Sequence, residues 1–220
     1  MSRPRRFDLI VFDWDGTLLD STALITRCIQ SACADIGTPV PSDRDASYVI
    51  GLGLAEALQH AAPQLRRERY PELAARYRHH YLANHASVLL FDGTLGMLQG
   101  LKARNHLLGV ATGKTRRGLD DALQTAQLKG LFDSTRTADE TASKPHPRML
   151  LELMREFGVA PARTLMVGDT THDLQLAANA GAASIGVSYG AHEHGAVRGF
   201  DTCHVAHSTA DLHAWLESHA

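Results

Sequence analysis

Acidic side chains follow two short apolar runs that lie far apart in the sequence. Asp13 and Asp15 come directly after the first run, and Asp169 and Asp173 come after the second. Neighbouring carboxylates repel one another unless a cation or a shared proton compensates their charge. Converging carboxylates form a hard oxygen site, which suits Mg²⁺ better than zinc. The residue types therefore predict that these aspartates meet around a Mg²⁺ ion.

Groups that can hold phosphate oxygens occur near further turns of the chain. Thr112 and Gly113 follow another apolar run and precede a helical pattern, which places a hydroxyl and backbone N–H groups at a helix start. Lys144 lies in a turn bounded by prolines, where a fixed ammonium neutralises phosphate and crowded carboxylates. Gly16 permits the turn after Asp15. The predicted substrate-binding residues are Gly16, Thr112, Gly113 and Lys144.

The elements that must position these residues are four short, continuously apolar runs. They occupy residues 8–12, 107–111, 164–167 and 184–187. A strand covered on both faces of a sheet has this pattern, and strands that alternate with helices indicate an α/β fold. The sequence predicts a Rossmann-like, doubly wound parallel sheet. In such sheets ligands bind beyond the carboxyl ends of the strands, where the polar residues above are found.

The segment between the first two apolar runs has a different character. It is rich in Ala, Leu, Arg and His, and helical spacing recurs over residues 24–36, 54–61 and 65–82. About sixty residues is long for one crossover connection. We therefore predict a helical cap at residues 21–84, inserted into a core of residues 1–20 and 85–220. The alternative is a set of crossover helices packed on the sheet.

The order of the motifs resembles that of the haloacid dehalogenase superfamily, in its phosphoglycolate phosphatase-like branch. The family pattern is Asp-x-Asp-Gly-Thr, then Thr or Ser, then Lys, then Gly-Asp-x-x-x-Asp. It is matched here at Asp13-Trp14-Asp15-Gly16-Thr17, Thr112, Lys144 and Gly168-Asp169-Thr170-Thr171-His172-Asp173. The resemblance extends over about residues 7–187. Each motif alone is a weak signal, and the ordered set is a strong one.

The resemblance implies a role for each of the first two aspartates. Asp13 would attack phosphorus, form a covalent aspartyl-phosphate and bind Mg²⁺. Asp15 would bind the metal through its backbone carbonyl, while its side chain protonates the leaving oxygen and then activates water. A halide leaves without a proton, so Asp15 favours cleavage of a phosphate ester over cleavage of a carbon–halogen bond.

The resemblance also implies roles for the later motifs. Asp169 would supply a further side-chain ligand to the metal. Asp173 would assist the metal through water or orient Lys144, although a plain N-cap of the following helix is the alternative. Thr112 and Lys144 would hold the phosphoryl oxygens.

These roles predict a Mg²⁺-dependent phosphatase for small phosphorylated metabolites, with 2-phosphoglycolate as the first candidate substrate. A phosphosugar mutase uses the same core and remains an alternative. A non-enzymatic phospho-acceptor resembling a receiver domain is a third hypothesis, although such domains are shorter and have no inserted cap. The motifs specify neither the physiological substrate nor the oligomeric state.

Composition limits the partners of the protein. The formal charge of −2 gives no overall positive field for nucleic acid or an anionic membrane. The three cysteines lack metal-binding or redox spacing, which indicates a reducing compartment. The first apolar run is too short for a signal core or a membrane span. We expect a cytoplasmic protein that binds a small organic phosphate and neither nucleic acid nor membrane.

Three remaining features are interpreted without a catalytic role. Asp20 is expected to cap the helix that begins near Ser21. The sequence His192-Glu193-His194 has metal-ligand spacing, but in a glycine-bearing loop it is expected to be solvated surface. Residues 48–53 either dip over the site or form a plain linker, and the sequence does not separate these alternatives.

Overall fold

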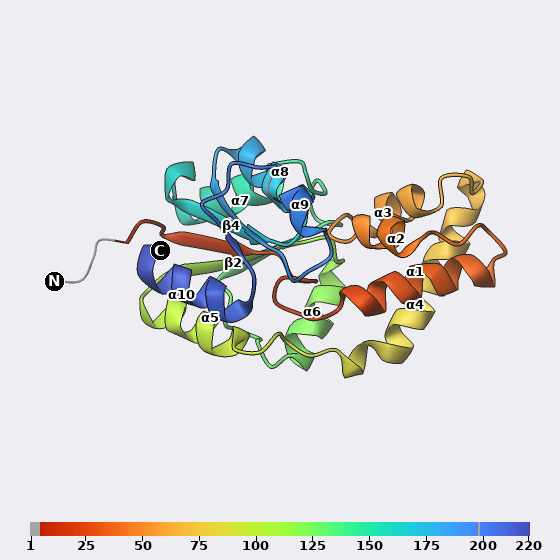
Figure 1. Cartoon of the computed structure of the whole chain (residues 1–220), viewed down its shortest axis with the longest axis horizontal. Helices are drawn as coiled ribbons and strands as arrows, with labels where there is room; N and C mark the ends of the chain where they lie inside the picture. Colours follow the sequence, from red (N-terminus) through yellow and green to blue (C-terminus); the bar gives the residue numbers. More distant parts are fainter. Residues whose placement is uncertain (1–4, 198) are drawn as a thin grey trace.

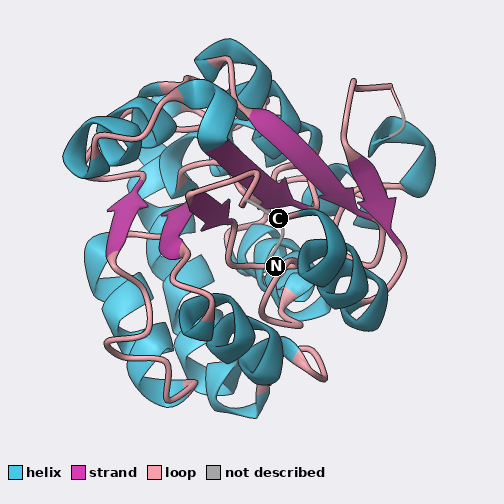
Figure 2. Cartoon of the chain, turned by 90° about the vertical axis from the view of Figure 1, so that its left-hand side faces the viewer, coloured by secondary structure: helices cyan, strands magenta, loops and turns pink. Residues whose placement is uncertain are grey.

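The protein is built on a parallel β-sheet with helices on both faces (Figures 1 and 2). The computed structural model describes residues 5–197 and 199–220. Within these residues the sheet has six strands in the order β3-β2-β1-β4-β5-β6, all parallel. The strands are β1 (Leu9–Phe12), β2 (Leu107–Thr112), β3 (Ser134–Thr137), β4 (Thr164–Gly168), β5 (Ala183–Val187) and β6 (His204–Ala206). The predicted α/β class is confirmed.

Alternating side chains of the central strands build two separate cores. Ile10 and Phe12 belong to one hydrophobic cluster, whereas Leu9 and Val11 belong to another on the opposite face. All four are buried, which explains why this strand is apolar without alternation. Among the flanking helices, α5 and α10 contribute to the first cluster, and α7 and α8 contribute to the second.

The helices outside the 21–84 segment connect and cover the strands. They are α5 (Thr94–Ala103), α6 (Arg116–Thr125), α7 (Arg148–Phe157), α8 (Thr171–Ala180), α9 (His194–Val197) and α10 (Thr209–His219), with a 3₁₀ turn at Pro161–Arg163. None of the helices in the described part of the chain is long and apolar enough to cross a membrane.

A group of helices with its own core follows β1. It consists of α1 (Thr22–Asp35), α2 (Asp43–Tyr48), α3 (Leu54–Ala61) and α4 (Tyr70–Asn84), with 3₁₀ turns at Arg67–Arg69 and His85–Ser87. Figure 1 shows these helices gathered at the right, apart from those that flank the sheet. Their buried residues, among them Ile29, Cys33, Leu58 and Leu73, form a third cluster.

The boundaries of the helical segment depart from the prediction in one place. A helix was expected over residues 65–82, but α4 begins only at Tyr70, after the 3₁₀ turn. Pro71 lies in its first turn, where a missing N–H and a fixed φ favour a helix start. The division into a cap at 21–84 and a core at 1–20 and 85–220 stays a proposal, and residues 1–4 lie outside the described residues.

Loss of packing in the third cluster should destabilise the helical group. Leu73 on α4 is fully buried, so Leu73→Ala should lower the free energy of unfolding by about 2–5 kcal/mol. Leu82→Ala on the same helix is the matched control, because Leu82 is 61% exposed. Urea unfolding measures both variants. Equal effects of the two substitutions would contradict the packing described for α4.

Candidate active site

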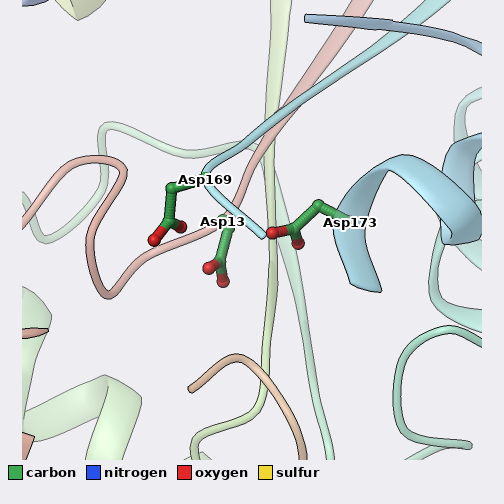
Figure 3. A group of neighbouring side chains, drawn as sticks. All are labelled: Asp13, Asp169 and Asp173. Carbon is green, nitrogen blue, oxygen red and sulfur yellow. The ribbon is translucent and has the colours of Figure 1, made fainter. Parts of the chain in front are cut away.

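Three aspartates meet at the carboxyl ends of the two central strands. Asp13 directly follows β1, Asp169 directly follows β4, and Asp173 lies in the first turn of α8. One carboxylate oxygen of each lies within 4.8 Å of the others, and all three residues are buried. Figure 3 shows Asp173 pointing from α8 toward Asp13, with Asp169 on the other side of Asp13. The structure thus brings together residues 160 positions apart in the chain (173 − 13).

A buried lysine lies between two of these carboxylates. The Nζ atom of Lys144 is 2.6 Å from Asp13 Oδ1 and 2.6 Å from Asp173 Oδ1. Burial alone would lower the pKa of Lys144, but the two carboxylates outweigh it, so the pKa is raised and the side chain stays an ammonium. Burial raises the pKa of Asp13 well above its ordinary value, and Lys144 opposes that effect.

Asp173 has a different partner on each oxygen. Its Oδ2 accepts hydrogen bonds from the N–H (3.1 Å) and the hydroxyl (2.7 Å) of Thr170, which completes a capping box at the start of α8. Its Oδ1 faces Lys144. The two interpretations of Asp173 are therefore compatible: the same carboxylate caps the helix and orients the lysine. Gly168 permits this approach, since a Cβ there would lie 2.3 Å from Asp173 Cγ.

Asp169 is held by two hydrogen bonds. Its Oδ1 accepts from the hydroxyl of Thr17 at 2.9 Å, and its Oδ2 accepts from the backbone N–H of Ala191 at 2.6 Å. Gly16 has φ +82° and lies so close that a Cβ would be 2.2 Å from Asp169 Oδ2, so glycine is required there by conformation and by space. Burial, followed by the Asp173 carboxylate, raises the pKa of Asp169 to about 7.

The donor set fits a hard divalent cation. Asp13 Oδ2 is buried and has no hydrogen-bond partner within the described ranges. Such an orphaned acceptor is rare in a folded protein unless an ion or a water molecule satisfies it. Asp169 retains acceptor capacity, because each carboxylate oxygen can take more than one partner. Asp173 Oδ1 likewise has no hydrogen bond of regular geometry among the described residues, but it is ion-paired with Lys144 at 2.6 Å, and Oδ2 is held by Thr170. Asp13 and Asp169 are therefore the better placed of the three for direct ligation.

The second carboxylate of the first motif is paired with a lysine that the sequence reasoning missed. Asp15 Oδ2 lies 2.9 Å from Lys114 Nζ, and Asp15 Oδ1 accepts from the hydroxyl of Ser21 at 2.6 Å. Lys114 also donates to the Tyr81 hydroxyl at 3.0 Å. The one feature of the sequence that could have identified Lys114 is its position directly after Gly113, a predicted phosphate-binding residue.

The expectation that Asp20 caps the first helix was wrong. Asp20 is exposed, and Ser21 is the N-cap residue of α1.

The predicted phosphate-binding turn lies under the 48–53 loop. Thr112 is buried at the end of β2, and its hydroxyl oxygen accepts from the Lys114 N–H at 3.2 Å. A Cβ on Gly113 would lie 2.2 Å from the carbonyl oxygen of Leu52, so only glycine fits beneath the loop. The N–H of Gly53 donates to Ser143 Oγ at 2.9 Å, next to Lys144. The loop therefore contacts the core at two predicted binding turns and is more than a linker.

One histidine expected on the surface is buried instead. His192 and His172 both bond the carbonyl oxygen of Tyr48 through Nε2, at 2.9 Å each. The N–H of Thr171 donates to His192 Nδ1 at 3.1 Å, which leaves the proton on Nε2. The expectation of a solvated His192 was wrong because this long-range contact cannot be read from local spacing. The side chain of His194 lies outside the described residues.

Comparisons with known protein sequences identify the family of this chain. The sequence model of the family described as "Haloacid dehalogenase-like hydrolase" matches residues 10–187. A Dickeya dadantii protein named "Probable phosphatase IndB" is 38% identical over 84% of this chain and 82% of its own length. The "Phosphoglycolate phosphatase" of Mannheimia succiniciproducens is 31% identical over 84% of this chain and 87% of its own.

A solved structure agrees with the sequence comparisons. It is described as a predicted phosphoglycolate phosphatase from Haemophilus somnus, and it superposes with a TM-score of 0.82 at 27% identity. The match covers 94% of this chain and 96% of the other. The expected family relationship is confirmed. The chain belongs to the haloacid dehalogenase-like hydrolase family.

Proposed function

We propose that the protein is a Mg²⁺-dependent phosphatase that hydrolyses small organic phosphate monoesters through a phosphoaspartyl intermediate on Asp13. One observation carries the proposal. Asp13 is a buried carboxylate with one oxygen held by Lys144 and the other without a hydrogen-bond partner among the described residues. A nucleophile needs a free oxygen in a fixed position, and a neighbouring cation balances the incoming phosphate charge.

The proposed reaction has two steps. In the first, a bond forms between Asp13 and phosphorus while the bond from phosphorus to the ester oxygen breaks, and Asp15 gives its proton to the departing alcohol. In the second, water attacks phosphorus, passes a proton to Asp15 and releases phosphate and free Asp13. Mg²⁺, held by Asp13, Asp169 and the backbone carbonyl of Asp15, would supply charge neutralisation and orientation. Lys144 and the Thr112 turn would hold the phosphoryl oxygens.

The positions of the neighbouring groups support these roles. Ser21 and Lys114 hold the Asp15 side chain as a carboxylate in a fixed orientation, so it would take up a proton before it acts as the acid. The 48–53 loop covers the Thr112–Gly113 turn, and we propose that the helical group at residues 21–84 acts as a cap that excludes bulk water. Three free cysteines, two of them buried, suit the cytoplasm as the location of this enzyme.

The names of the relatives support the reaction type more than any one substrate. Relatives between 31% and 38% identical are named as a phosphatase, as phosphoglycolate phosphatases and as a pyrophosphatase. A phosphosugar mutase remains the alternative. A Bacteroides vulgatus structure described as a "Putative beta-phosphoglucomutase" has a TM-score of 0.84, but at 20% identity it shows the fold alone. Product analysis separates the two, because a mutase isomerises its substrate without releasing phosphate.

Removal of the nucleophile should abolish turnover. Asp13→Asn removes the anionic oxygen, so Mg²⁺-dependent phosphate release from para-nitrophenyl phosphate should fall by about 10⁴-fold or more. Asp20→Asn is the matched control, since Asp20 is an exposed aspartate close to the motif and should be dispensable. Undiminished turnover of Asp13→Asn would refute the assignment of the nucleophile.

Loss of the proton donor should depend on the leaving group. Asp15→Asn should lower kcat/KM for ethyl phosphate by about 10²- to 10⁴-fold, because an alkoxide needs a proton to leave. The loss in kcat/KM for para-nitrophenyl phosphate should be smaller, since nitrophenolate leaves without one. Equal losses for the two esters would show that Asp15 is not the general acid.

The buried carboxylates should make stability depend on pH when metal is absent. The pKa of Asp169 is about 7 in the folded protein against an ordinary 3.8, so the folded state binds more protons between these values. Stability in EDTA should therefore fall as pH rises from about 4 to about 7, by on the order of a few kcal/mol. Urea unfolding across this range measures the effect.

Two controls accompany the pH measurement. Asp169→Asn lacks the titrating group and should show a shallower decline with pH. Added Mg²⁺ should stabilise the wild type more at pH 8 than at pH 5, because the metal binds the deprotonated carboxylates. A wild-type profile parallel to that of Asp169→Asn, with no effect of Mg²⁺, would exclude Asp169 from the metal site.

A further inference from the structure

A cavity of about 400 Å³ opens on the leaving-group side of the site. Asp15, Gly113, Lys114 and one face of α6 line it from the core, and α1, α3, α4 and the 48–53 loop line it from the helical group. Asp13 is not part of this lining. The proposed proton donor, but not the nucleophile, faces the cavity, so this space would receive the alcohol half of the substrate rather than its phosphoryl group.

The walls of the cavity are mainly apolar. Side chains from four elements contribute, namely Ile25, Ile29, Leu52, Leu54, Ala57, Tyr77 and Tyr81. The rings of Tyr77 and Tyr81 stack along α4 at 6.0 Å between centroids. An apolar surface of this kind stabilises a ligand in proportion to the apolar area that the ligand removes from water.

The charged side chains of the cavity provide few free partners for the carboxylate of a small acidic substrate. The ammonium of Lys114, on a side chain that is 11% exposed, is paired with Asp15 at 2.9 Å and bonded to Tyr81. Arg78 and Arg117 also line the cavity, but both are exposed, and Arg117 lies near Asp121 at 4.0 Å. A second carboxylate on the substrate would therefore compete with Asp15 for Lys114, or be limited to the exposed arginines and the half-buried imidazole of His85.

The cavity is also larger than glycolate, the alcohol that 2-phosphoglycolate would release. At about 30 Å³ for each water-sized group, the five non-hydrogen atoms of glycolate would fill at most about 150 Å³. The cavity instead falls in the range of about 300–1,000 Å³ that is typical of sites for larger organic ligands.

We propose that the preferred substrate is a phosphate monoester with a bulky, uncharged and largely apolar alcohol, of which an aromatic ring is the simplest case. This inference rests on the proposed phosphatase function. It names the class of leaving group and ranks 2-phosphoglycolate, the first candidate from the sequence, below such esters.

A matched pair of esters tests the proposal. Ethyl phosphate and 2-phenylethyl phosphate release alcohols of similar acidity and differ by the ring alone. We expect kcat/KM to be at least tenfold higher for 2-phenylethyl phosphate than for ethyl phosphate or 2-phosphoglycolate. Equal values, or a preference for 2-phosphoglycolate, would overturn the proposal while leaving the phosphatase function intact.

Substitutions in the cavity wall test whether this cavity determines the preference for the larger ester. Ala57→Phe fills the cavity and should bring the ratio of kcat/KM between the two esters toward one. Leu54→Asp places a charge in the wall, should act in the same direction, and serves if Ala57→Phe fails to fold. Leu151→Ala is the control, because Leu151 is an exposed leucine of α7 outside the cavity, and it should keep the ratio. An unchanged ratio in both wall variants would overturn the assignment.

Binding measurements distinguish failure of the phosphatase function from failure of the proposed role of the cavity. If no ester releases phosphate, the proposed function fails, and calorimetry with 2-phenylethylphosphonate and ethylphosphonate then decides the preference of the cavity. At least tenfold tighter binding of the phenylethyl compound to the wild type would support it. Equal binding, or no binding of either compound, would overturn it.

Discussion

The ammonium of Lys144, buried between Asp13 and Asp173, is the interaction on which the rest of the site depends. A charge taken out of water is stable only beside opposite charge or hydrogen-bond partners, and removal of one member of a buried pair costs about 3–5 kcal/mol. The lysine neutralises part of the carboxylate cluster, and Thr170 holds the far oxygen of Asp173. The remaining negative charge, on Asp13 and Asp169, is what a divalent cation would balance.

Backbone geometry makes this concentration of charge possible. The aspartates approach one another because glycines leave room at the strand ends, as at Gly168 beside Asp173 and at Gly16 beside Asp169. A parallel sheet brings the carboxyl ends of β1 and β4 to one edge, so residues distant in sequence share one site. The same edge is covered by the 48–53 loop at Gly113, and the burial of Asp13, Asp169 and Lys144 strengthens the electrostatic contacts among them.

Sequence patterns predicted those features of the fold that depend on residues close together in the chain. The strands β1, β2, β4 and β5 were found because burial on both faces requires continuous apolar residues, whereas β3 and β6 lie toward the sheet edges and were missed. In β3 the sequence Ser-Thr-Arg-Thr carries no apolar signal. The carboxylates and Lys144 followed from motif order. The contact of Lys114 with Tyr81, and the burial of His192 against Tyr48, depend on approach of the helical group to the core, which spacing does not encode.

The central claim is that the phosphoryl group passes through Asp13. The most direct test is a single-turnover reaction with a ³²P-labelled ester in Mg²⁺, quenched with acid within milliseconds and followed by proteolysis and mass spectrometry of the labelled peptide. The account predicts a transient, acid-stable phosphoryl adduct on Asp13 that forms before free phosphate appears and decays as phosphate is released. Free phosphate that appears with no labelled protein at any time, or a label on another residue, would contradict it.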